Sequence, residues 1–186
     1  RREFRALAGM LPGTGDCELQ ISADPALELA PAMSWLLRYD YGCLEQTLSR
    51  VVPLLALREI SDQLLLPAIA NSQEGSEWEV RQALLRLSTL EQPYGGYGTW
   101  PGTNRVWVGG SVHACHFLYE AQRAGYPVDG DMAKRARVFL RRLIEEFQRY
   151  PQASPVERAH AVYLLAAFGE PEPGIALGIA EDAKSN

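Results

Sequence analysis

The sequence predicts an all-α protein, an array of helical hairpins of the α/α toroid type that is preceded by a short β segment. From residue 24 onward, apolar residues return at three- and four-residue steps, and Gly, Pro and capping residues separate the periodic segments. Before residue 24, turn residues precede the stretch 17–22, whose alternation of apolar and polar residues is typical of a half-buried strand.

The first predicted helices contain prolines. The first covers about 24–38, and Pro31 is expected to interrupt or kink it. The second covers about 43–57, with Pro53 as an expected kink or break, and an apolar piece follows at 64–69.

Four further helices of similar length follow, at about 78–92, 111–124, 131–147 and 154–168. Asp131 is predicted to cap the third of these, and a Ser-Pro-Val-Glu capping box opens the fourth. A glycine and two prolines follow the fourth helix and are interpreted as its stop. Short connections between helices of this length predict hairpins.

The composition excludes two broad classes. Charged residues make up 22% of the chain and its net charge is −5, without a basic block, so nucleic acid is a poor candidate partner. No run of 18 apolar residues is present, so we expect no membrane contact from this segment. The cysteines, Cys17, Cys43 and Cys115, lack the spacing of a zinc finger or a disulfide scaffold.

The segment 39–47, YDYGCLEQT, is the most informative part of the sequence. Gly42 permits a sharp backbone turn, and Cys43 and Gln46 share a face if a helix begins there. Attack of the thiol on the carboxamide, with loss of ammonia, would form a thioester between Cys43 and Gln46. A helix N-terminus favours the thiolate, both for this step and as a leaving group.

A thioester of this kind is an acyl donor that works once, so the protein would not be an enzyme. An amine or hydroxyl attacks the Gln46 carbonyl and releases Cys43. The bond must be kept from water, and Tyr39, Tyr41 and the nearby Trp35 are candidate covers. The alternative is a helical interaction domain without a thioester, in which Cys43 lies in the core and Gln46 on the surface.

The segment 41–47 resembles the thioester motif of the alpha-2-macroglobulin family, especially its bacterial members. Animal members carry Gly where Leu44 stands. The segment 92–102 resembles the family's turn between toroid helices, and 116–126 resembles the following helix of bacterial members.

The resemblance implies that 1–23 is the end of a preceding CUB-like β domain and that 24–186 is the first half of the thioester domain. The whole protein would be a broad-spectrum protease inhibitor of bacterial defence, periplasmic or extracellular, with any lipid anchor outside this segment. The sequence begins without Met and without a signal peptide, so we expect a piece of such a larger chain, in contact with its other domains. No cofactor is implied.

By the same resemblance, Cys43 and Gln46 form the bond and Tyr39 shields it. Complement-type members direct the acyl group to hydroxyls with a histidine, and His160 matches that position poorly. Direct aminolysis is therefore expected, with Lys amines of attacking proteases as the targets.

His113, His116 and Glu120 share a helix face and suggest a metal site, with Cys115 or His160 nearby. Zinc-binding helices more often place two His four residues apart, so ordinary polar packing is the preferred interpretation.

The glycine-rich segment 92–102 is also similar to turns of terpene cyclases and prenyltransferases, a second alternative. Those enzymes need acidic clusters, whereas Asp129-Gly130-Asp131 is interpreted as a loop and a helix cap.

Five basic residues fall on one predicted helix, and the last two of them have a glutamate four positions further on. This pattern predicts a solvated, salt-bridged helix face. Its members are Lys134, Arg135, Arg137, Arg141 and Arg142, with Glu145 and Glu146 as the acidic partners.

Overall fold

The computed structural model describes residues 32, 35–37, 42–56, 75–93 and 95–185, and the statements below concern these residues. Their regular elements are helices, which confirms the predicted all-α class. The elements are α2 (Leu44–Ala56), α5 (Gly75–Leu90), α6 (Val108–Arg123), α7 (Gly130–Glu145), the 3₁₀ helix η2 (Phe147–Arg149), α8 (Pro155–Ala167) and α9 (Pro173–Ser185). The predicted strand at 17–22, the boundary at residue 23 and the apolar piece 64–69 lie outside the described residues, as does most of the predicted helix 24–38.

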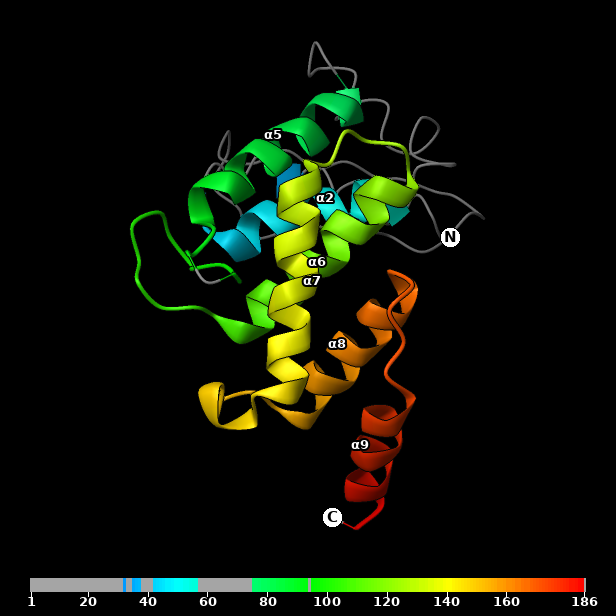
Figure 1. Cartoon of the computed structure of the whole chain (residues 1–186). Coiled ribbons are helices and arrows are strands. Elements are labelled where there is room, and N and C mark those ends of the chain that lie inside the picture. The colour runs from blue at the N-terminus through cyan, green and yellow to red at the C-terminus, as the bar shows by residue number, and fades with distance from the viewer. Residues whose placement is uncertain (1–31, 33–34, 38–41, 57–74, 94, 186) are drawn as a thin grey trace, which may run out of the picture.

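Neighbouring helices pack on one another in the manner of hairpins (Figure 1). Helix α2 lies against α5 and α6, and α6 also contacts α7 and α8. Helices α7 and α8 form a hairpin joined by η2, and α9 lies at the C-terminal end against α8. The head of α2 therefore lies where the first helices of the array meet.

A single cluster of buried apolar side chains joins five of these helices. Its largest fully buried members are Tyr97, Phe117, Phe139, Leu44, Leu48, Leu87, Leu90, Leu118, Leu140, Leu143 and Leu164. The buried residues of α2 follow three- and four-residue steps, so one face of the helix enters this core. Within the described ranges, no helix has both the length and the apolar character needed to cross a bilayer.

Several details of the helices differ from the sequence prediction, although α2 covers the predicted range. Helix α2 is not broken by Pro53 but continues to Ala56. The cap of α7 is Asp129, whose carboxylate accepts a hydrogen bond of 2.8 Å from the Met132 amide, whereas Asp131 lies in the first turn. The prolines after α8 do not only stop a helix, since Pro173 begins α9, which the sequence analysis missed.

The connection between α5 and α6 contains a tight turn with two glycines in left-handed conformation. Gly95 and Gly96 have φ values of 86° and 76°, and the Gln92 amide donates to the Gly96 carbonyl at 3.0 Å. An ideal Cβ on Gly96 would lie 2.8 Å from both a Phe139 ring carbon and a Val106 methyl carbon. The turn therefore needs glycine for its φ and for the close approach of α7.

Gly96→Ala should reduce the free energy of unfolding by about 2–5 kcal/mol, from left-handed strain of about 1–2 and overpacking of about 1–3. Gly102→Ala is the matched control, because Gly102 has a φ of 77° but no heavy atom within 4 Å of its ideal Cβ. Gly102→Ala should reduce the free energy of unfolding by the left-handed strain alone, about 1–2 kcal/mol. Urea denaturation of both variants measures the difference, and equal losses would contradict the packing argument.

Candidate functional site

Cys43 is the residue directly before α2, and only 7% of its surface is exposed. Gln46 stands at the third position of the helix and is half-buried. The sequence prediction that a helix begins at this motif is therefore confirmed. The two side chains share the first turn, where backbone N–H groups have no partner inside the helix.

Cys43 and Gln46 contact each other in both directions. The Cys43 amide donates to Gln46 Oε1 at 3.3 Å, and the Gln46 amide donates to Cys43 Sγ at 3.4 Å. This is the arrangement of a capping box, with a thiol in the place of the usual hydroxyl. It brings the thiol and the carboxamide together on the first turn, as the three-residue spacing requires.

The backbone around Cys43 is held by hydrogen bonds from both sides. The Leu44 amide donates to the Thr99 carbonyl at 3.0 Å, and the amide and hydroxyl of Thr47 donate to the Cys43 carbonyl at 3.0 and 2.9 Å. Arg86 of α5 donates through Nε and Nη2 to the Gly42 carbonyl at 3.0 and 2.6 Å. The peptide before Cys43 and the peptide after it are therefore both fixed by other parts of the chain.

Gly42 has a role that differs from the one predicted. Its φ lies outside the left-handed region, so the turn itself does not require glycine. An ideal Cβ on Gly42 would lie 2.7 Å from Arg86 Nη2, which is closer than real Cβ atoms approach. A side chain at position 42 would therefore displace the Arg86 guanidinium from its present place.

The sequence analysis missed Arg86 and Thr99. Both reach the head of α2 from distant segments, and Arg86 is 44 positions from Gly42. An arginine on a periodic helix carries no local signal of such a contact. Of the predicted covers, Tyr39 and Tyr41 lie outside the described residues, and most of the Trp35 side chain faces solvent, with 62% exposed.

Comparisons with known proteins agree on one family, although no protein-family model matches the chain. The alpha-2-macroglobulin of Escherichia coli K12 is 30% identical over 142 residues, 75% of this chain and 8% of that protein. The alpha-2-macroglobulin of Ralstonia nicotianae is 25% identical over 186 residues, 95% of this chain and 11% of that protein. The chain therefore spans about a tenth of the length of these relatives.

Solved structures give the same result. A tyrosine-to-glycine mutant of Salmonella alpha-2-macroglobulin superposes with a TM-score of 0.73 and 25% identity, over 87% of this chain and 11% of that chain. Native E. coli alpha-2-macroglobulin, from domain MG7 to the C-terminus, superposes with a TM-score of 0.69 and 24% identity, over 87% of this chain and 26% of that chain. The chain belongs to the alpha-2-macroglobulin family.

His116 and His160 lie between α6 and α8, whereas His113, also on α6, lies within electrostatic range of Glu45 in the first turn of α2. His160 Nε2 lies 3.2 Å from His116 Nδ1, and the two rings meet edge to face. Glu120 Oε1 lies 3.8 Å from His116 Nε2, and Cys115 is turned into the core toward the Ala136 carbonyl. Among the described residues, no group of three His, Cys, Asp or Glu side chains could hold a metal ion.

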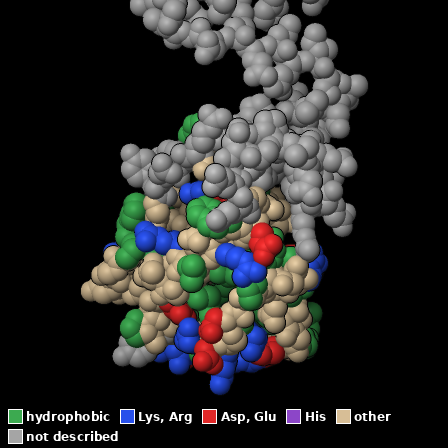
Figure 2. Space-filling model, turned by 90° about the horizontal axis from the view of Figure 1, so that it is seen from above, with side chains coloured by type: hydrophobic (Ala, Val, Ile, Leu, Met, Phe, Trp, Pro, Cys, Tyr) green, Lys and Arg blue, Asp and Glu red, His purple; other side chains and the backbone are tan. Residues whose placement is uncertain are grey.

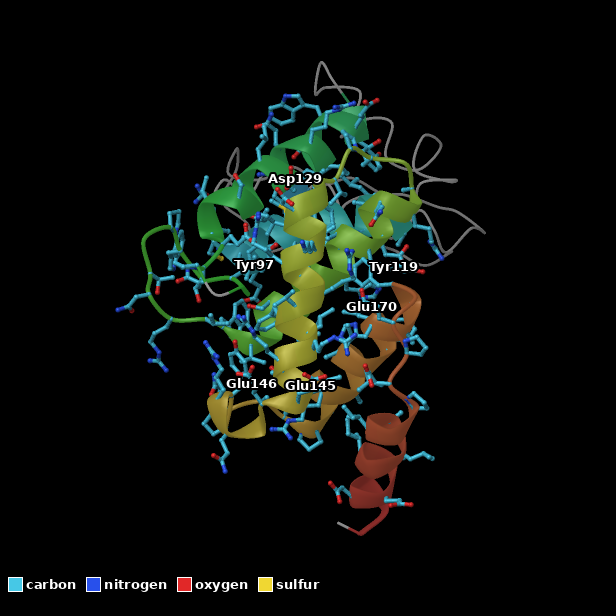
Figure 3. All side chains as sticks on the ribbon, viewed as in Figure 1. Tyr97, Tyr119, Asp129, Glu145, Glu146 and Glu170 are labelled. Carbon is cyan, nitrogen blue, oxygen red and sulfur yellow. The ribbon has the colours of Figure 1, made fainter. Side chains whose placement is uncertain are left out.

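The basic face of α7 is salt-bridged, as its charge pattern predicted. Arg141 lies 3.5 Å from Glu145 and Arg142 lies 4.0 Å from Glu146. Figure 3 shows both glutamates at the end of α7 opposite Asp129.

Other elements supply partners that the sequence did not predict. Arg135 lies 2.6 Å from Glu91, Arg137 lies 3.1 Å from Glu170, and Arg141 pairs with Glu170 at 2.9 Å and with Glu172. In the space-filling view, Lys and Arg side chains are interspersed with Asp and Glu where the described surface is visible (Figure 2). The face therefore carries neutralised charge rather than a basic field.

The aspartates at 129 and 131, the nearest match to the acidic cluster that a terpene cyclase needs, belong to the start of a helix. The Asp129 carboxylate is used as a helix cap, and Asp131 is an exposed residue of the first turn of α7. The segment does supply a helix cap, as interpreted, but the cap is Asp129, and Gly130 and Asp131 belong to α7.

The stability of the chain should fall as the pH is lowered through about 6.5. Burial lowers the pKa of His113 and His160, and the neighbouring His116 lowers both further, while Glu45 acts in the opposite direction on His113. The unfolded chain then binds protons that the folded chain does not, so acid favours unfolding. Because the rings are half-buried, we expect an effect below about 1 kcal/mol for each histidine.

Thermal unfolding of the natural protein and of a His160→Gln variant between pH 7.5 and 5.5 measures this effect. The carboxylates titrate alike in both proteins, so the difference between the two curves isolates the histidine. The variant should lose less stability toward acid, and parallel curves would contradict the assignment.

Proposed function

We propose that Cys43 and Gln46 form an internal thioester, and that the whole protein is an inhibitor that traps attacking proteases covalently through it. The observation that carries the proposal is the pair of reciprocal contacts, 3.3 Å from the Cys43 amide to Gln46 Oε1 and 3.4 Å from the Gln46 amide to Cys43 Sγ. Membership of the alpha-2-macroglobulin family supports it, as does a Salmonella relative whose structure was solved after reaction with methylamine.

The chemistry follows from these contacts. Sγ attacks Cδ of Gln46, the C–N bond breaks, and ammonia leaves with the thiol proton. The negative charge that develops on Oε1 meets the Cys43 amide, which already points at this oxygen and acts as an oxyanion donor. The positive end of the α2 dipole stabilises the same charge.

Release reverses the roles of the two groups. An amine attacks Cδ, an amide forms on Gln46, and Cys43 leaves as a thiolate that takes up a proton. The burial of Cys43 and Leu44 restricts access of water to this bond before a target arrives. We also propose that Tyr39 and Tyr41 complete this shield, that 24–186 is half of a thioester domain, and that the protein acts in the periplasm or outside the cell.

The second candidate is a helical interaction domain without a thioester. The same reciprocal contacts favour it, because they form a helix cap for α2 without any covalent bond. The two candidates differ in mass, and that difference decides between them.

Intact mass spectrometry of the complete protein should give a value about 17 Da below that of its unmodified residues, because one ammonia is lost. Methylamine should then add about 31 Da and expose one thiol. Cys43→Ser and Gln46→Ala should abolish both changes. Cys115→Ser is the matched control, because Cys115 is a buried core residue away from Gln46 and should leave both changes in place. An unmodified mass in the natural protein would establish the interaction domain instead.

The choice of nucleophile gives a separate prediction. His160 is held by His116, and the hydrogen bonds between Cys43 and Gln46 involve no histidine, so we expect direct aminolysis. Competition between labelled methylamine and labelled glycerol should give uptake of the amine, at Gln46. Preferential uptake of glycerol would contradict the assignment of Lys side chains as targets.

A further inference from the structure

Arg86 and the Gly42–Cys43 peptide form a continuous chain of hydrogen bonds that ends on the acyl group. We propose that Arg86 is a positioning residue for the thioester, acting through this peptide; the inference rests on the proposed function. Arg86 donates to the Gly42 carbonyl at 3.0 and 2.6 Å, and the Cys43 amide donates to Gln46 Oε1 at 3.3 Å.

The peptide bond between Gly42 and Cys43 couples the Arg86 contact to the Gln46 contact. The Gly42 carbonyl and the Cys43 N–H belong to the same planar group, so a residue that fixes the carbonyl also fixes the direction of the N–H. Arg86 therefore orients the donor that faces Oε1. A cation bonded to the carbonyl oxygen also polarises the amide, which makes its N–H a stronger donor.

The site is built to admit the guanidinium. Gly42 has no side chain at the point where a Cβ would lie 2.7 Å from Nη2 and 3.1 Å from Cζ of Arg86. The Glu79 carboxylate between α2 and α5 is paired with Arg50 at 2.7 Å. Arg86, which lies on the same helix as Glu79, donates to the Gly42 backbone carbonyl. Gly42, Arg50, Glu79 and Arg86 line one surface hollow of about 220 Å³.

The competing account is that Arg86 only ties α5 to α2. A tie of that kind affects stability, whereas a positioning residue also affects the rate at which amines open the thioester. Arg50 supplies the comparison, because its ion pair with Glu79 also joins α2 to α5 and no contact described here joins it to Gly42.

The test uses the complete protein with the substitutions Arg86→Gln, Arg86→Lys, Arg50→Gln and Arg81→Gln. Arg81 lies on the same helix and pairs with Glu77 on the exposed surface, so its loss should change nothing. For each protein, intact mass gives the fraction that carries the thioester, methylamine treatment gives the rate constant of opening, and thermal unfolding gives Tm.

Arg86→Gln should lower the thioester fraction or slow opening by about tenfold, less than the loss of a direct oxyanion donor. Arg86→Lys should give values between those of the natural protein and Arg86→Gln, because a lysine keeps the charge but cannot donate two hydrogen bonds in the fixed geometry of a guanidinium. Arg50→Gln should lower Tm without changing the rate. If Arg86→Gln fails to fold, the rate in Arg86→Lys decides.

The positioning role would be overturned if Arg86→Gln kept the thioester fraction and the opening rate of the natural protein. If only Arg86→Lys folds, the same result in that variant would overturn it. An equal change of the opening rate in Arg50→Gln would overturn it too. Absence of the thioester from the natural protein would instead refute the proposed function, and the two failures are distinguishable.

Discussion

An α-helix begins with backbone N–H groups that have no carbonyl partner within the helix, and the structure at the head of α2 depends on how these donors are satisfied. The Leu44 amide is bonded by the Thr99 carbonyl of the α5–α6 connection, and the Gln46 amide by the Cys43 thiol. The Gln46 side chain in turn accepts from the Cys43 amide. Capping therefore places a nucleophilic sulfur beside a carboxamide, and the same contacts that begin the helix prepare the proposed chemistry.

Much of the fold could be predicted because its signals are local. The spacing of apolar residues gave α5 to α8, and the box of Ser154 and Glu157 at the head of α8 is present as expected, since both partners lie within one turn. The meeting of Cys43 and Gln46 was predictable for the same reason.

The errors have physical causes. In Asp129-Gly130-Asp131 either aspartate suits a cap, so the local sequence does not decide between them, and in the structure Asp129 accepts the hydrogen bond from the Met132 amide. Proline both ends and begins helices, so Pro173 was taken as a stop. The contact of Arg86 with Gly42 depends on the packing of α5 against α2, which no local pattern encodes.

The two described cysteines show how position decides chemistry. Cys115 is fully buried on α6, and burial raises the pKa of its thiol well above the usual range. It therefore stays protonated and packs as a small apolar group. Cys43 is also buried, but its neighbours are backbone amides at a helix end and the Gln46 carboxamide. The two cysteines therefore differ in their surroundings although both are buried.

The connection that precedes the last helix is held to α7 by ion pairs. Between α7 and the α8–α9 connection, the described contacts include partly exposed ion pairs from Arg137 and Arg141 to Glu170 and Glu172. Such pairs weaken as counterions accumulate around them, whereas the apolar cluster beneath does not. The link between α7 and the α8–α9 connection is thus partly ionic, and a rise in salt concentration should loosen it before it affects the apolar cluster.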